Sequence, residues 1–188
     1  MTSHYVDLTV VPDTETGVPP LLGALYDKLH RALVQQRLDS IGVSFPKYSV
    51  IPRNLGETLR LHGDEAVLHG LLAGDWMRSV RDHVRSTGTT PVPAGAAHRV
   101  VRRRQFKTNA ERLRRRRMQR KGETAEQAAR AIPDSAAHTP NLPYVHLRSL
   151  STGQPFCMFI ALSSLQSEPI HGRFNAYGLG QDCTIPWF

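Results

Sequence analysis

The sequence lacks the features that mark membrane, secreted and disulfide-rich proteins. Its 188 residues contain no run of 18 apolar residues, and the N-terminus has no basic stretch followed by an apolar one, which predicts neither a transmembrane helix nor a signal peptide. The two cysteines, Cys157 and Cys183, match no zinc spacing and cannot build a disulfide framework. These absences predict a cytoplasmic protein with reduced thiols and no membrane partner.

Motifs for metals and cofactors are also missing. None of the nine histidines stands in an HExxH motif or a paired-ligand spacing, and no Gly-Lys-Ser phosphate loop occurs. The aromatic strand signature of RNA recognition motifs is absent, so base stacking on a sheet is not predicted. The sequence therefore predicts no metal site and no cofactor.

Positive charge is concentrated in one segment. The chain has 24 lysines and arginines against 16 aspartates and glutamates, a net charge of +8. Between Arg99 and Lys121 twelve residues are basic and one is acidic, which leaves 12 basic and 15 acidic residues elsewhere. A mildly acidic body with one cationic segment favours a polyanionic partner, most often nucleic acid. A solvated tail or a patch for an anionic membrane is the alternative.

Hydrophobic periodicity in the first half predicts the element order β-α-β-β-α-β. Strands are expected over residues 4–10, 40–46, 57–63 and 96–106, and helices over residues 19–36 and 64–84. This is the order of the ferredoxin-like unit, a common RNA-binding scaffold. The predicted fold class is α+β, with a ferredoxin-like domain over 1–95 and a C-terminal α/β domain over 96–188 that carries an arginine-rich helix.

The other expectations concern the middle and the end of the chain. Residues 85–97 are rich in Pro, Gly and Thr and are predicted to form a linker. Helices are expected from Arg112 to Lys121 and over residues 124–132, which Pro133 follows. A hairpin is expected to turn at residues 151–153.

The first of these helices carries most of the positive charge. Thr108 and Glu111 have the spacing of a capping box at its start, and Gly122 is a natural residue to follow its end. At 100° per residue, one helix face gathers basic and amide side chains, namely those of Arg112, Arg115, Arg116 and Gln119, with Arg120 at its edge. The opposite, thinly apolar face can dock on the protein while this face meets phosphates.

The stretch RRRQF upstream of the helix suits base recognition. Arginine pairs with guanine and glutamine pairs with adenine through two hydrogen bonds each, which makes Arg103 and Gln105 candidate base readers. An exposed strand face is the alternative interpretation of both residues.

Several stretches resemble one known family. RRQFKTNAERLRRRRMQRKGETAEQAARAIPD, LRSLSTGQPF and YGLGQDCTIPWF, with YDKLHRALV and IGVSFP in the first half, resemble the type I-F CRISPR repeat endoribonucleases, which cut the CRISPR precursor transcript into guide RNAs. The likeness covers nearly the whole chain in the same order. It implies a CRISPR repeat hairpin RNA as partner and metal-independent cleavage at the 3′ base of its stem. It also implies other subunits of a CRISPR surveillance complex as partners of a protein that is monomeric when free.

The resemblance implies roles for individual residues. His30 would be the catalytic base, Ser149 would position the reacting 2′-hydroxyl, and Tyr177 would complete the pocket. The residues implied to contact RNA are the base readers Arg103 and Gln105, then Lys107, Arg112, Arg115, Arg116, Gln119 and Arg120, and at the foot of the stem Ser151 and Phe156. Two positions depart from the family pattern. Gln119 stands where the family commonly has another arginine that lines the RNA groove, and Lys121 with Gly122 replaces a basic or His-containing helix end. The resemblance therefore does not decide whether this end of the helix contacts phosphates.

The chemistry suits a histidine. RNA carries its own nucleophile: a base removes the 2′-hydroxyl proton, and the oxygen attacks the adjacent phosphorus to give a 2′,3′-cyclic phosphate and a 5′-hydroxyl. Histidine is the natural base near neutral pH. His30 lies one step outside the leucine stripe of its helix, where it can point into a cleft, and His146 is the second candidate.

Two other functions compete with the endoribonuclease. One is a non-catalytic hairpin RNA-binding subunit of a CRISPR ribonucleoprotein. The other is a DNA-binding protein that uses the basic helix for recognition, although no coiled coil or half-site symmetry is present. The combination of His30 and Ser149 favours the endoribonuclease over the binding subunit.

Overall fold

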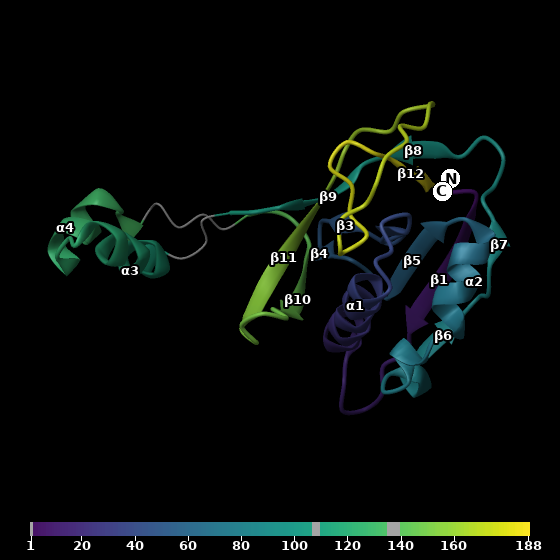
Figure 1. Cartoon of the computed structure of the whole chain (residues 1–188), viewed down its shortest axis with the longest axis horizontal. Coiled ribbons are helices and arrows are strands. Elements are labelled where there is room, and N and C mark those ends of the chain that lie inside the picture. The colour runs from purple at the N-terminus through teal and green to yellow at the C-terminus, as the bar shows by residue number, and fades with distance from the viewer. Residues whose placement is uncertain (1, 107–109, 135–139) are drawn as a thin grey trace. The chain divides into compact units, whose positions relative to one another are not determined.

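The computed structural model describes residues 2–106, 110–134 and 140–188. The chain forms two compact units, one made of residues 1–103 and 142–188 and the other of residues 104–141 (Figure 1). These units do not coincide with the predicted domains of residues 1–95 and 96–188, because the chain rejoins the first unit after residue 141. A division of roles between the two predicted halves stays a prediction.

A five-stranded antiparallel sheet forms the centre of the first unit. Its order is β2-β5-β1-β6, and β7 also pairs with β1. The strands are β1 (His4–Val10), β2 (Gly42–Ser44), β5 (Thr58–Gly63), β6 (Val84–Ser86) and β7 (Thr90–Pro91). Because β1 and β2 both run antiparallel to β5, they point the same way, and helix α1 (Val18–Gln35) connects them. The predicted mixture of helices and sheet, α+β, is confirmed.

The apolar core lies on one face of this sheet. Val6, Leu8 and Val10 alternate with less buried residues along β1, as the predicted half-buried strand requires. The leucines that repeat at helical spacing in α1 are buried against them, namely Leu22, Leu25, Leu29 and Leu33. The predicted first strand and first helix are therefore confirmed.

The opposite face of the sheet is polar, yet it is covered by protein. Arg60 is only 9% exposed, forms a bidentate pair with Asp7, and lies between the rings of Tyr5 and Phe188 at 4.6 and 4.1 Å. His62 beside it is fully buried, and burial lowers its pKa to about 3, so its ring is neutral. The C-terminal residue thus closes a face that many sheets leave open to ligands.

The second helix is shorter than predicted. Helix α2 runs over Glu65–Ala73, where Asp64 caps its first turn, and it ends before Gly74, whose backbone is extended. The residues up to 84 form two short 3₁₀ turns, η1 (Asp75–Met77) and η2 (Arg81–His83). The prediction of one helix over 64–84 was wrong: the chain leaves the helical conformation at Gly74, a residue type with low helix propensity.

The predicted linker and the strand after it also differ from the structure. Residues 85–97 include most of β6 and all of β7, which pair with β1, so this segment belongs to the sheet. The strand expected over 96–106 is two strands, β8 (Ala97–Arg99) and β9 (Val101–Arg104). β8 pairs with the C-terminal strand β12 (Ile185–Trp187), and β9 joins a different sheet. Pairing with distant strands decided these assignments.

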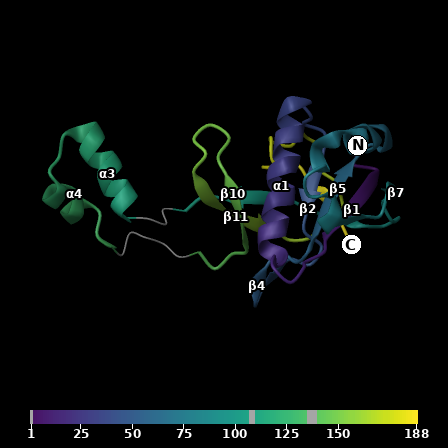
Figure 2. The ribbon, with the colours of Figure 1, turned by 90° about the horizontal axis from the view of Figure 1, so that it is seen from below.

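A three-stranded sheet of order β10-β11-β9 lies beside α1 (Figures 1 and 2). Strands β10 (Tyr144–Arg148) and β11 (Pro155–Leu162) form the predicted hairpin, and Gly153 supplies the left-handed backbone of its turn with a φ of 66°. A short hairpin of β3 (Ser49–Val50) and β4 (Arg53–Asn54) completes the strands of this unit. Of the described helices, none has the length and apolar character needed to cross a membrane.

The second unit holds two helices, α3 (Ala110–Lys121) and α4 (Ala125–Ala131). Gly122 follows α3 in the left-handed conformation, with a φ of 64°, and its N–H donates to the carbonyl of Met118, as a helix C-terminus requires. Thr124 and Gln127 form a capping box that starts α4. These helices overlap the ranges expected from the sequence, 112–121 and 124–132, whereas the expected capping residue Thr108 lies outside the described residues.

Candidate functional site

His30 lies on α1 in a nearly enclosed position, only 6% exposed. Its Nδ1 is 2.6 Å from the carbonyl oxygen of Ala176. A carbonyl can only accept a hydrogen bond, so Nδ1 must carry a proton, and in the neutral ring the lone pair is then on Nε2. This contact selects the tautomer that leaves Nε2 free to take up a proton.

The ring of Tyr177 stacks on His30. Their centroids are 3.9 Å apart and the ring planes differ by 11°. Tyr26, one turn before His30, donates its hydroxyl hydrogen to the Tyr177 carbonyl at 2.8 Å. Burial raises the pKa of the Tyr177 phenol, while the nearby Arg103 cation opposes that rise. The phenol therefore stays protonated at neutral pH and can donate a hydrogen bond.

A tight turn holds Ala176 and Tyr177 in place. The side-chain oxygen of Asn175 accepts from the backbone N–H groups of Tyr177 and Leu179 at 2.8 and 3.2 Å. Gly178 has a φ of 70°, and a Cβ there would lie 2.5 Å from a methyl of Val43, so only glycine fits. The YGLG motif therefore places the carbonyl that fixes the tautomer of His30.

The β10–β11 hairpin carries Ser149 at the end of β10. The Ser149 hydroxyl lies 3.2 Å from that of Ser151 and accepts from the Thr152 N–H at 3.3 Å. The Arg148 N–H donates to the carboxylate of Asp27, which lies three residues before His30 on α1. This contact ties the Ser149 end of the hairpin to the helix that carries His30.

Arg103 and Phe156 meet on the side of this sheet that faces α1. The Arg103 guanidinium lies 5.1 Å from the centroid of the Phe156 ring, and both residues are half-buried. Arg103 is also close enough to Tyr177 to influence its pKa. Arg103 and Phe156 therefore lie in the same part of the first unit as Tyr177 and His30.

His146, the second candidate base, points to the other face of the hairpin. It is exposed, its Nδ1 lies 3.5 Å from the Cys157 sulfur, and its ring packs edge-on against Tyr144. Val145 and Leu147, its neighbours on β10, are buried toward α1. Of the two free cysteines, Cys157 is exposed and Cys183 is buried.

In the second unit, the exposure of α3 follows the predicted helical wheel. The residues expected on the polar face are all exposed, namely Arg112, Arg115, Arg116, Gln119 and Arg120. On the other side, Arg114 pairs with Asp134 at 2.8 Å and Arg117 pairs with Glu123 at 2.5 Å. Two of the six arginines thus connect α3 to the chain around α4, while Arg115, Arg116 and Arg120 are exposed.

Two predicted RNA contacts lie at the start of the second unit. Gln105 is exposed, and Lys107 lies outside the described residues. A hollow of about 620 Å³ in the same unit is lined by Arg116, Arg120 and Lys121 together with apolar residues of both helices. Its cationic lining continues the exposed face of α3.

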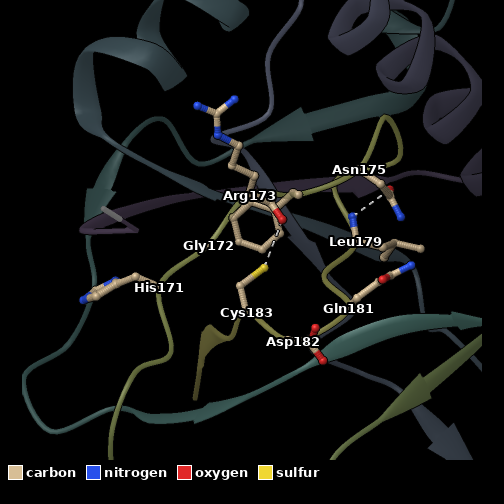
Figure 3. A pocket seen from close by; sticks show the side chains of 9 residues that line it. His171, Gly172, Arg173, Asn175, Leu179, Gln181, Asp182 and Cys183 are labelled. Carbon is tan, nitrogen blue, oxygen red and sulfur yellow. Dashed lines mark hydrogen bonds between the residues drawn. The ribbon is translucent and has the colours of Figure 1, made fainter.

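A separate hollow of about 410 Å³ lies beside the turn that carries Tyr177 (Figure 3). Asn175 and Leu179 line both the hollow and the turn. The exposed Arg173 at its rim pairs with Asp39 at 2.9 Å, and the Cys183 thiol donates to the Arg173 carbonyl. None of the predicted site residues lines this hollow.

Sequence reasoning missed the groups that orient the predicted residues. Asp27 and Asn175 act through backbone N–H groups, and Ala176 contributes a main-chain carbonyl, which no residue pattern reveals. The sequence signals that pointed here were the place of His30 beside the leucine stripe of its helix and the motifs that carry the family resemblance. Across the described residues, no group of three or more His, Cys, Asp or Glu side chains is placed to hold a metal ion.

The fold and the site define a mixed α and β protein with a buried histidine stacked on a tyrosine and a separate arginine-rich helical unit. Residues 5–188 match the model of a family described as CRISPR-associated protein (Cas_Csy4). The chain belongs to this family, and the family predicted from the sequence is confirmed.

Two relatives are similar along their whole length. A protein of Pseudomonas aeruginosa (strain UCBPP-PA14) named CRISPR-associated endonuclease Cas6/Csy4 is 44% identical over 185 residues, which cover 98% of this chain and 99% of that protein. A protein of the same name from Escherichia coli (strain UTI89 / UPEC) is 40% identical with the same coverage.

Proposed function

We propose that the chain is a CRISPR RNA endonuclease that cuts the repeat hairpin at the 3′ base of its stem and retains the product. The names of both relatives support an endonuclease acting in a CRISPR system. The observation that carries the proposal is the 2.6 Å contact between His30 Nδ1 and the Ala176 carbonyl, because it leaves Nε2 able to act as a base.

In the proposed mechanism, His30 Nε2 removes the proton of the 2′-hydroxyl upstream of the cut. The oxygen attacks the adjacent phosphorus in line and expels the 5′-oxygen, which leaves a 2′,3′-cyclic phosphate and a 5′-hydroxyl. Proton removal by a positioned base contributes about 10²–10⁴-fold to such a rate. Alignment of the reacting atoms contributes much of the remainder.

Ser149 and Tyr177 hold the substrate in this proposal. The Ser149 hydroxyl hydrogen-bonds the reacting nucleotide, and Tyr177 forms one wall of the pocket through its ring stack on His30. Phe156 stacks on the base pair at the foot of the stem, and Ser151 contacts the same nucleotides. Arg103 reads a basal pair, and its position over the Phe156 ring supports that role.

The second unit supplies affinity. In this proposal the exposed face of α3 enters the groove of the hairpin, because Arg115, Arg116 and Arg120 are exposed there, while the described ion pairs of this helix involve Arg114 and Arg117. In the same proposal Gln105 hydrogen-bonds a base of the RNA, and Lys107 contacts the RNA backbone. The groove and backbone contacts of α3 come from Arg112, Arg115, Arg116, Gln119 and Arg120.

The proposal extends to architecture and assembly. The sheet order β2-β5-β1-β6 and the connection of β1 to β2 through α1 support a ferredoxin-like domain. The free protein is a monomer in the cytoplasm. It joins other subunits of a CRISPR surveillance complex together with its retained RNA.

Replacing Arg115 and Arg116 together with alanine is expected to weaken hairpin binding. Each lost phosphate contact lowers the slope of log affinity against log salt concentration by about one, so the double variant loses about two. Binding titrations over a range of salt concentrations measure this slope. Replacing the exposed Arg81 and Arg85 changes the net charge equally and is the matched control. A slope equal to that of wild type would show that the α3 pair faces solvent in the complex.

One cleavage assay tests the function. A labelled CRISPR repeat hairpin is incubated with the protein in EDTA, and the products are separated on a denaturing gel, with a native gel in parallel. We expect one cut at the 3′ base of the stem and a product with a cyclic phosphate. A native shift without cleavage would point to a binding subunit, and preference for duplex DNA would overturn both assignments.

A further inference from the structure

Strand β10 is an edge strand whose free side lies along helix α1. Among the described strands it pairs with β11 alone, so the N–H and C=O of every second residue along it point away from that partner. Two of these groups meet α1. The His146 carbonyl lies so close to Gly23 that a Cβ there would be 2.6 Å from the oxygen. The Arg148 N–H donates to both carboxylate oxygens of Asp27, at 3.3 and 3.2 Å.

The spacing of these two contacts matches along helix and strand. Gly23 and Asp27 are four residues apart, a rise of about 6 Å along a helix, and His146 and Arg148 are two residues apart, about 6.6 Å along a strand. On the helix, His30 follows Asp27 by three residues on the same face, a rise of about 4.5 Å. On the strand, the residue after Arg148 is about 3.3 Å further along. That next residue is Ser149, so the register of strand and helix brings it to the turn of His30.

Asp27 provides the specific polar contact between α1 and β10. Within the described parts of the chain, it is the one α1 side chain hydrogen-bonded to β10. Gly23 allows close approach but supplies no directional bond. Asp27 is half-buried, and no cation is paired with it in the described residues. The carboxylate is therefore committed to the N–H that immediately precedes Ser149.

We propose that Asp27 is a positioning residue whose carboxylate holds the Arg148 N–H and so sets the distance between Ser149 and His30. The inference rests on the proposed function, which assigns Ser149 and His30 to the reaction. Without the tie, the edge strand slides or lifts from α1, while the arginine-rich helix that supplies affinity is untouched. A displacement of about 1 Å at reacting groups can cost 10²-fold in rate.

Two substitutions separate this role from a direct role of the charge. Asp27→Ala removes the acceptor and is expected to lower the single-turnover cleavage rate by about 10- to 100-fold, with hairpin affinity within about three-fold of wild type. Asp27→Asn keeps an amide oxygen that accepts from the same N–H, and is expected to recover most of the rate with an unchanged pH–rate profile. Asp82→Ala removes an exposed carboxylate of η2 and is the matched control.

Hydrogen exchange at the Arg148 amide measures the hydrogen bond to Asp27 independently of cleavage. Asp27→Ala should raise that exchange rate, and Asp27→Asn should raise it less. The proposal is overturned if the amide exchanges equally in all variants, if Asp27→Ala cuts as fast as wild type, if Asp27→Asn is as slow as Asp27→Ala, or if affinity falls as much as rate. A wild-type protein that does not cut the hairpin would instead refute the proposed function, and the amide exchange would still test the tie.

Discussion

His30→Ala is expected to lower the single-turnover cleavage rate by about 10²-fold or more while hairpin affinity stays within a few-fold of wild type. The proposed task of His30 is to take one proton after the RNA has bound. A 10²-fold loss corresponds to about 2.7 kcal/mol of activation free energy. Rapid-quench assays with enzyme in excess measure the chemical step, and filter binding measures affinity.

His69→Ala provides the matched control for this variant. His69 lies on α2 and is exposed, and its Nε2 is 3.9 Å from a carboxylate oxygen of Glu65 on the same helix. Its substitution should leave rate and affinity unchanged. Cleavage by His30→Ala at the wild-type rate would refute His30 as the base and make His146 the next residue to test.

A 2′-deoxy sugar immediately upstream of the cut is expected to abolish cleavage by the wild-type protein. In the proposed mechanism the 2′-oxygen is the nucleophile, so its removal leaves no group to attack the phosphorus. Binding should be preserved, because the groove contacts of α3 and the basal-pair readers do not use that hydroxyl. Cleavage is followed on denaturing gels and binding on native gels.

The control substrate carries the deoxy sugar in the loop of the hairpin, away from the cut, and should be cleaved normally. Cleavage of the first substrate would mean that water or a protein group attacks the phosphorus. Such a result would remove the 2′-hydroxyl mechanism but leave the hairpin-binding proposal in place.

The structure departs from the sequence prediction at Gly74 and at residues 84–91. The hydrophobic periodicity located the helix at Glu65–Ala73 but extended it to residue 84. The spacing of apolar residues does not show that the backbone at Gly74 is extended. The composition of residues 85–97 suggested a linker, yet β6 and β7 pair with β1, which lies almost eighty residues earlier. Pairing with a distant strand leaves no local sequence signal.

At the candidate site, the sequence pointed to the candidate side chains but not to the groups that orient them. The wheel of α3 separated the exposed Arg115 and Arg116 from Arg114 and Arg117, because helical geometry alone determines which residues share a face. The partners of the last two, Asp134 and Glu123, depend on how α4 folds back on α3.

The sequence by itself determined the α+β class, the approximate places of the helices predicted over residues 19–36 and 112–121, the concentrated positive charge and the family, because these depend on local periodicity, composition and motif order. Only the tertiary structure decided the tautomer of His30, since its partner is a main-chain carbonyl 146 residues away. The tertiary structure likewise joined the Arg148 N–H to Asp27 across 121 residues. Backbone groups are identical at every residue, so their partners follow from the packed chain and not from the order of its side chains.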